Sequence, residues 1–223
     1  RKAFEKAIAA DPGHVAARVG LAQFYLGAPG IAGGSVEKAK AQGDALLAMP
    51  GKRGEYQGRM VLAGIAAHEK DWAEMSRQCT AAGTAAGDGA DPVGPLRSQA
   101  WYLLNRKKDP QAALPVIERY VKAAPADDLT ALFLDGEVKR QLGRCADALP
   151  RYDQVIAKFA EAQGATGAAR RVMGPRVQDA QQVEERHEQE AVGRPVVDVP
   201  DEIAERGLFD DLADRSVRPV GGR

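Results

Sequence analysis

One helical pattern returns along this chain at an almost constant interval. Short amphipathic helices end at Pro12, Pro50 and Pro125, and proline stops a helix because it lacks an N–H donor and disfavours helical backbone before it. Segments 71–82 and 145–155 fit the same register without the proline. The equivalent positions are Ala7, Ala45, Ala82, Tyr120 and Val155, which lie 38, 37, 38 and 35 residues apart. Such regular self-similarity predicts a repeat protein.

A second set of helices is expected between these segments. Residues 15–26, 56–68, 96–106 and 129–142 carry apolar side chains at intervals of three and four, the period of one helix face. Each repeat is therefore a first helix, a short turn and a second helix. Lys70-Asp71 and Gly143-Arg144 are expected in two of the turns.

Residues 27–35 predict an unusually long turn within one repeat. Its glycines precede a helix, as in some phosphate-binding loops, but no Lys-Ser or Lys-Thr follows them, so a P-loop is excluded. Ser35 is expected instead to cap the following helix through its hydroxyl oxygen.

Composition excludes several classes of protein. The chain has 223 residues with 31 basic and 31 acidic side chains, which argues against nucleic-acid binding through a net positive field. A hydrophobic fraction of 44% is enough for a packed core, yet no apolar run is long enough to span a membrane. Two cysteines exclude a disulfide scaffold and a four-thiolate zinc site.

The residues with catalytic potential are isolated from one another. His14 and His68 are expected at the surface, and His187 forms a single Glu-x-x-His in a charged stretch, where a di-iron site needs two such motifs. Cys79 falls on a bulky core position, where a thiol behaves as a small hydrophobe. We therefore expect no catalytic residue, no metal and no cofactor; the alternative is a metal–carboxylate enzyme through His187.

Residues at set positions within these helix pairs resemble the tetratricopeptide repeat family. Phe4, Ala7 and Pro12 follow the family pattern of a second helix closely, and Leu21, Ala22 and Tyr25 occupy first-helix positions. The resemblance covers roughly residues 1–160. It implies an all-α fold: a right-handed α-solenoid of stacked antiparallel helix pairs.

The resemblance also implies a function. Members of this family hold a peptide or protein on a concave wall lined by first helices. The inward-facing positions include Leu26 and Gly64, and the predicted groove residues are Gln23, Met60, His68, Tyr102, Asn105, Arg106, Glu137, Arg140 and Gln141. Arg106 and Arg140 would suit an acidic side chain or a terminal carboxylate, the alternative being solvated charges on ordinary helix faces.

The composition changes after Lys158. Nine arginines and no lysine follow in the last 65 residues. We expect a capping helix over residues 161–191 and a disordered, polar tail over 192–223. Translation in a wrong frame is an alternative origin for this segment.

The leading hypothesis is thus a non-catalytic module or scaffold that binds a protein partner. The alternative is an accessory repeat region of a larger enzyme or exported assembly whose active domain precedes residue 1, since the sequence begins at Arg1 without a methionine. A cytoplasmic and an exported, periplasmic location both remain open, as does the oligomeric state.

Overall fold

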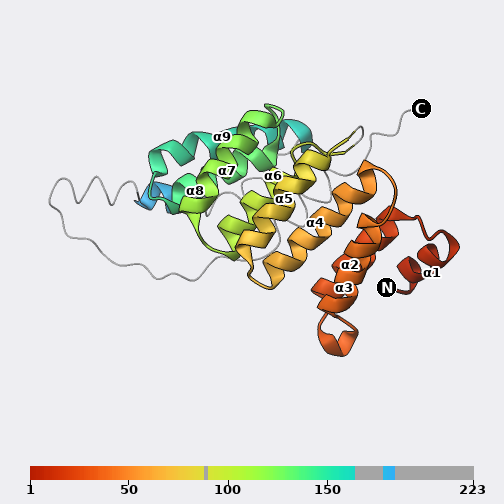
Figure 1. Cartoon of the computed structure of the whole chain (residues 1–223). Helices are drawn as coiled ribbons and strands as arrows, with labels where there is room; N and C mark the ends of the chain where they lie inside the picture. Colours follow the sequence, from red (N-terminus) through yellow and green to blue (C-terminus); the bar gives the residue numbers. More distant parts are fainter. Residues whose placement is uncertain (88–89, 164–177, 184–223) are drawn as a thin grey trace, which may run out of the picture. The chain divides into compact units, whose positions relative to one another are not determined.

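The computed structural model describes residues 1–87, 90–163 and 178–183 (Figure 1). Every regular element in these ranges is helical, which confirms the predicted all-α class. The helices fall into two compact units that meet in the sequence between Ala124 and Pro125. The predicted division at residues 160 and 191 stays a prediction, because most of the chain beyond 163 lies outside the described residues.

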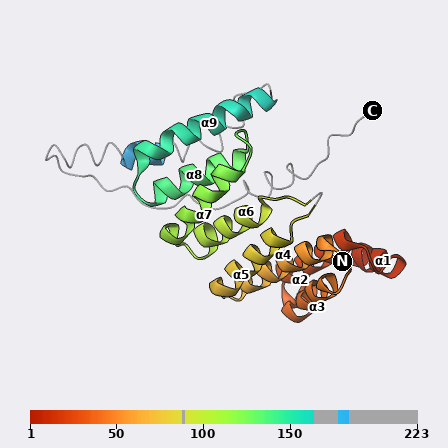
Figure 2. The ribbon, with the colours of Figure 1, turned by 45° about the horizontal axis from the view of Figure 1, so that its top comes forward.

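The first unit contains α1 (Lys2–Ala10), α2 (Val15–Gly27), α3 (Val36–Leu47), α4 (Lys52–His68), α5 (Trp72–Ala85), α6 (Gly94–Trp101) and α7 (Pro110–Ala123). A 3₁₀ turn, η1 (Gly30–Ala32), lies in the long turn before α3, and a π-helical turn, η2 (Tyr102–Arg106), follows α6. Each helix packs against the next along the chain, and α2 also packs against α4. Figure 2 shows these helices side by side in chain order.

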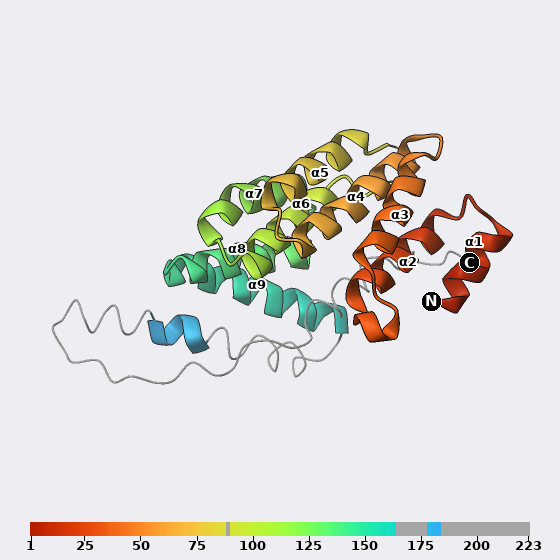
Figure 3. The same ribbon diagram turned by 60° about the horizontal axis from the view of Figure 1, so that its bottom comes forward.

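The second unit is built on α8 (Leu129–Gln141) and α9 (Cys145–Gln163), which pack against each other, and it includes a helical turn over residues 178–183. Figure 3 shows the two long helices from below. Eight consecutive residues of α8, from Ala131 to Val138, are buried. Gly136 makes the close packing possible, because a Cβ there would lie 2.8 Å from the Tyr152 ring.

The turns between first and second helices repeat one backbone conformation. Each contains a residue with positive φ: Gly33, Lys70, Lys108 and Gly143. These four residues lie 37, 38 and 35 residues apart, the same period that the sequence shows. The predicted turns at Lys70-Asp71 and Gly143-Arg144 are therefore confirmed.

Capping side chains set the start of several second helices. Ser35 accepts a hydrogen bond from Lys38 N at 3.2 Å, as predicted, and Asp71 accepts one from Glu74 N at 2.9 Å. Asp109 does the same for Ala112 N, and Pro110 takes the first helical position, where its missing N–H costs nothing. Helix α7 therefore begins at Pro110 and ends at Ala123, just before the predicted end at Pro125.

The core of the first unit lies between first and second helices. Leu21, Tyr25, Leu46, Val61 and Ile65 form one apolar cluster, from α2, α3 and α4. A second cluster joins Tyr56 of α4 to Ala82 and Ala85 of α5. Many of the buried residues are alanines, so the helices approach one another closely.

Candidate binding surface

Three successive first helices meet at Gly64. A Cβ at this glycine of α4 would lie 3.8 Å from Leu26 Cδ1 of α2 and 3.3 Å from the Tyr102 hydroxyl of η2. All three residues are half-buried, and all three were assigned to the inward-facing side from the resemblance. We call Leu26, Gly64 and Tyr102 the first-helix surface. A side chain larger than a methyl group at residue 64 would therefore meet both Leu26 and Tyr102.

Aromatic rings and a guanidinium extend this surface along η2. Trp101 and Tyr102 pack edge to face, with ring centroids 5.5 Å apart at an angle of 73°. The Arg106 guanidinium lies over the Trp101 ring, 5.6 Å from its centroid, and Arg106 is exposed. Burial raises the pKa of the Tyr102 hydroxyl, Cys79 adds to this effect and Arg106 opposes it. Tyr102 is therefore a neutral hydrogen-bonding group beside a cation.

The wide turn of η2 brings these side chains together. Lys107 N donates to the Tyr102 carbonyl at 2.9 Å, five residues back, where an α-helix would bond four residues back. Asn105 Nδ2 also donates to the Trp101 carbonyl at 3.2 Å. Single π turns inside helices occur frequently at functional sites. Here the turn lies on the predicted groove residues Tyr102, Asn105 and Arg106.

The remaining predicted groove residues of the first unit differ in their surroundings. Gln23 and His68 are exposed. Met60 is half-buried and packs against the Tyr56, Ala82 and Ala85 cluster between α4 and α5. Met60 thus contributes to the contact between a first and a second helix, which the groove assignment did not foresee.

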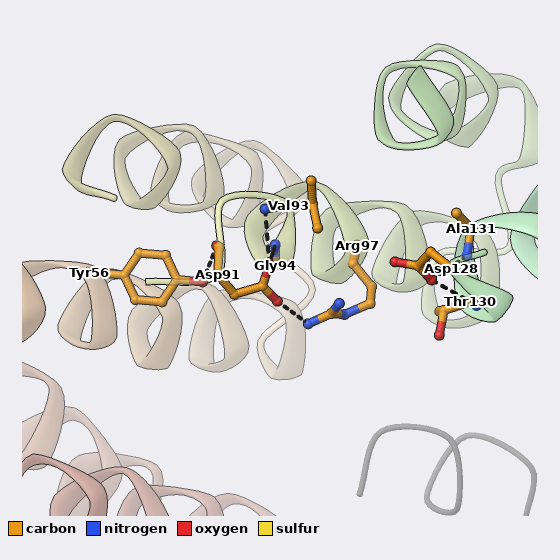
Figure 4. A network of polar contacts seen from close by, with 8 residues as sticks. All are labelled: Tyr56, Asp91, Val93, Gly94, Arg97, Asp128, Thr130 and Ala131. Atoms are coloured by element: carbon orange, nitrogen blue, oxygen red, sulfur yellow. Dashed lines mark hydrogen bonds and ion pairs between the residues drawn. The ribbon is translucent and has the colours of Figure 1, made fainter. Parts of the chain in front are cut away.

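A polar network that the sequence reasoning missed positions the start of α6 (Figure 4). Asp91 Oδ1 accepts from Val93 N and Gly94 N, both at 3.0 Å, and Arg97 Nη2 lies 2.5 Å from Asp91 Oδ2. The Tyr56 hydroxyl donates to the Asp91 carbonyl at 3.0 Å. This bond ties α4 to the loop that leads into α6. The sequence does hold a signal for this network, because Asp91 stands three residues before the Gly94-Pro95 start of α6.

Charge and burial stabilise this network. Burial raises the pKa of Tyr56 to about 12, with a further contribution from Asp91. Burial alone would lower the pKa of Arg97, but Asp91 and Tyr120 outweigh it and the pKa is raised. Both groups therefore keep their protons at neutral pH, and the network ties the start of α6 to α4.

The predicted groove residues of the second unit form a network of their own on α8. Glu137 is buried, and its carboxylate accepts from the Tyr152 hydroxyl at 3.0 Å and from Gln141 Nε2 at 3.0 Å. Arg140 donates to both oxygens of Glu137, at 2.7 Å from Nη2 and 3.3 Å from Nε. Glu137 is therefore engaged inside the unit, where it orients Arg140.

The histidines and cysteines show no assembled centre in the described ranges. His14 caps α2, accepting from Ala17 N at 3.2 Å through Nδ1. Cys79 is buried and its pKa is raised to about 12 by desolvation, so it is a packing residue as expected. Cys79 and Cys145 are both buried. Among the described residues no group of His, Cys, Asp and Glu is arranged to hold a metal, and His187 lies outside them.

No helix in the part of the chain that the structure describes is long and apolar enough to cross a membrane. No protein-family model matches this sequence, and no curated protein or solved structure matches it either. What the chain does must therefore be inferred from the contacts of its own residues.

Proposed function

We propose that this chain is a non-catalytic protein-binding module of the tetratricopeptide repeat type, which holds a peptide on its first-helix surface. The convergence of α2, α4 and η2 at Gly64 carries the proposal. It supports the expected arrangement, in which consecutive first helices line one wall of a right-handed solenoid. A wall of this kind is a common site for extended or helical peptides.

The side chains on this surface favour binding of a peptide with an acidic group. Tryptophan, tyrosine and arginine are enriched among the residues that contribute most to binding at protein interfaces. Trp101, at the end of α6, lies against Tyr102 and Arg106 of η2. The aromatic rings offer area for apolar side chains. The exposed guanidinium of Arg106 would pair with a carboxylate in two parallel hydrogen bonds.

Selection of peptides from a random library against the full chain tests this function. Arg106→Glu should weaken the selected peptides by at least about tenfold, because it reverses the charge at the carboxylate position. The matched control is Arg119→Glu on α7, an exposed arginine on a second helix. Gly64→Leu, compared with Gly83→Leu on α5, tests the surface itself, since a Cβ at residue 83 would enter open space.

Loss of binding in Arg106→Glu and Gly64→Leu, with both control variants unchanged, would support the proposal. Selected peptides that bind both test variants as tightly as the wild-type chain would contradict it. Failure of the wild-type chain to select any peptide would contradict it as well. Circular dichroism of each variant confirms that a loss of binding does not arise from unfolding.

A further inference from the structure

Arg140 of α8 is the second arginine that the resemblance places on the first-helix side, and its own unit holds it ready for an anion. The bidentate contact with Glu137 fixes the guanidinium plane, and the Tyr152 hydroxyl in turn fixes Glu137. Burial would lower the pKa of Arg140, but the hydrogen bonds and charge of Glu137 outweigh it and raise the pKa. Arg140 is therefore always charged, and its Nη1 points away from Glu137.

An aspartate further along the same chain forms an ion pair with that nitrogen. Asp179 Oδ2 lies 2.5 Å from Arg140 Nη1, and residue 179 belongs to the helical turn over residues 178–183. Within this turn Ala180 is fully buried and Val183 is half-buried, whereas the other four residues are exposed. Ala180 and Val183 are three residues apart and therefore lie on one face of the turn, which is covered. Asp179, next to this face, pairs with Arg140.

We infer that Arg140 marks a binding site for short helical segments. Such a segment carries an acidic residue, a small residue directly after it, and an apolar residue three positions after the small one. Residues 178–183 occupy this site in cis as a displaceable ligand. The inference rests on the proposed peptide-binding function and adds the class of partner. Asp179, Ala180 and Val183 supply this pattern in the chain itself.

Exposure of the contact explains why a partner can displace the segment. The Asp179 side chain is 51% exposed and that of Arg140 is 26% exposed, and ion pairs of this kind add little stability because water competes with them. The buried side of Arg140, by contrast, is held by Glu137, whose side chain is only 8% exposed. The arginine is therefore fixed within the unit, while the ion pair that joins it to its occupant is open to water.

A fluorescent peptide with the sequence of residues 174–187 serves as the probe, and its binding to the full chain is followed by fluorescence anisotropy. In the wild-type chain the cis segment competes with the probe. In Asp179→Lys the segment is repelled from Arg140, so the probe should bind at least about tenfold more tightly. Asp179→Asn is a milder second variant with the same expected direction. The matched control is Asp153→Lys on α9, an exposed aspartate of the same unit.

Arg140→Asp should remove probe binding, and a probe with Arg in place of Asp179 should restore it in that variant. Probe affinities that are equal in wild type, Asp179→Lys and Asp179→Asn would overturn the inference. So would a lower melting temperature of Asp179→Lys without tighter probe binding, which is the result for a purely structural cap. Peptides selected on the Arg106 surface report separately on the proposed function, because these variants leave η2 unchanged.

Discussion

Buried glycines determine how closely the helices of this chain approach one another. A Cβ at Gly54 of α4 would lie 2.7 Å from the Leu46 carbonyl oxygen and 2.8 Å from Met49 Cβ. Neither atom can rotate away, since one belongs to the backbone and the other is bonded to it. A Cβ at Gly83 of α5, by contrast, would enter open space.

The substitution Gly54→Ala should therefore lower the free energy of unfolding by about 1–3 kcal/mol, the usual cost of overpacking. Gly83→Ala should raise it by about 0.5–1 kcal/mol, because alanine loses less conformational entropy in a helix. Urea unfolding measures both values. Equal effects of the two substitutions would show that the close contact at Gly54 is absent.

Buried acids make the fold sensitive to alkaline pH. The pKa of Cys79 is raised from 9.0 to about 12 by desolvation, so between these values the unfolded chain loses a proton that the folded chain keeps. Stability is then complete below pH 9.0 and falls as the pH rises toward about 12. Tyr56, whose pKa is also raised to about 12, acts in the same direction at the upper end of this range.

Unfolding free energies measured from pH 8 to pH 11 test this dependence. The contribution of Cys79 should approach about 1.4 kcal/mol per pH unit in the middle of its range. Cys79→Val removes the thiol, so its profile should fall less steeply than that of the wild-type chain. Parallel profiles would contradict the burial of the thiol.

At the scale of the element, the turns between first and second helices carry strain at two lysines. Lys70 and Lys108 adopt φ values of 62° and 56°, whereas Gly33 and Gly143 fill the equivalent positions without a Cβ. A left-handed backbone costs an L-residue about 1–2 kcal/mol relative to its preferred conformation. Glycine relieves this cost but adds freedom to the unfolded chain.

Lys70→Gly should therefore raise the free energy of unfolding by about 0.5–1 kcal/mol. Lys40→Gly, at an exposed position inside α3, should lower it by about 1 kcal/mol. The opposite signs for the same substitution test the repeated turn, and thermal or urea unfolding of both variants is sufficient. A decrease for Lys70→Gly would contradict the turn conformation.

Local sequence signals were enough to predict the elements. Helical periodicity placed α2 and α8 to within a residue at each end, and Ser35 was predicted as a cap because its hydroxyl acts on an amide only three residues away. Helix α4 begins at Lys52, four residues before the predicted start, since the polar residues of its first turn carry no apolar periodicity.

Contacts between distant residues were harder to predict. The bond from Tyr56 to Asp91 spans 35 residues, and the pair of Arg140 with Asp179 spans 39. No local pattern encodes either one. Met60 was placed on the groove from its position in the repeat, but only packing shows that it lies against the Tyr56 cluster. Leu26, Gly64 and Tyr102 lie close together, but their position on a concave wall stays a prediction.

At the scale of the whole molecule, the turns of the structure repeat with the period of the sequence. Turn residues of one backbone conformation recur at the same spacing as the helices, and α1 to α7 pack in chain order. In such arrays each helix pair contacts its neighbours, so a surface that runs along successive first helices is a natural place for a ligand. The first-helix surface at Gly64 is where the proposed function is located.

Hydroxyl-radical footprinting of the full chain, with and without a selected peptide, tests that location most directly. Trp101 and Trp72 are both half-buried, the first beside η2 and the second at the start of α5. Peptide binding should lower the oxidation of Trp101, Tyr102 and Leu26 and leave Trp72 unchanged. Protection of Trp72 without protection of Trp101 and Tyr102 would place the ligand on the second helices and contradict the account.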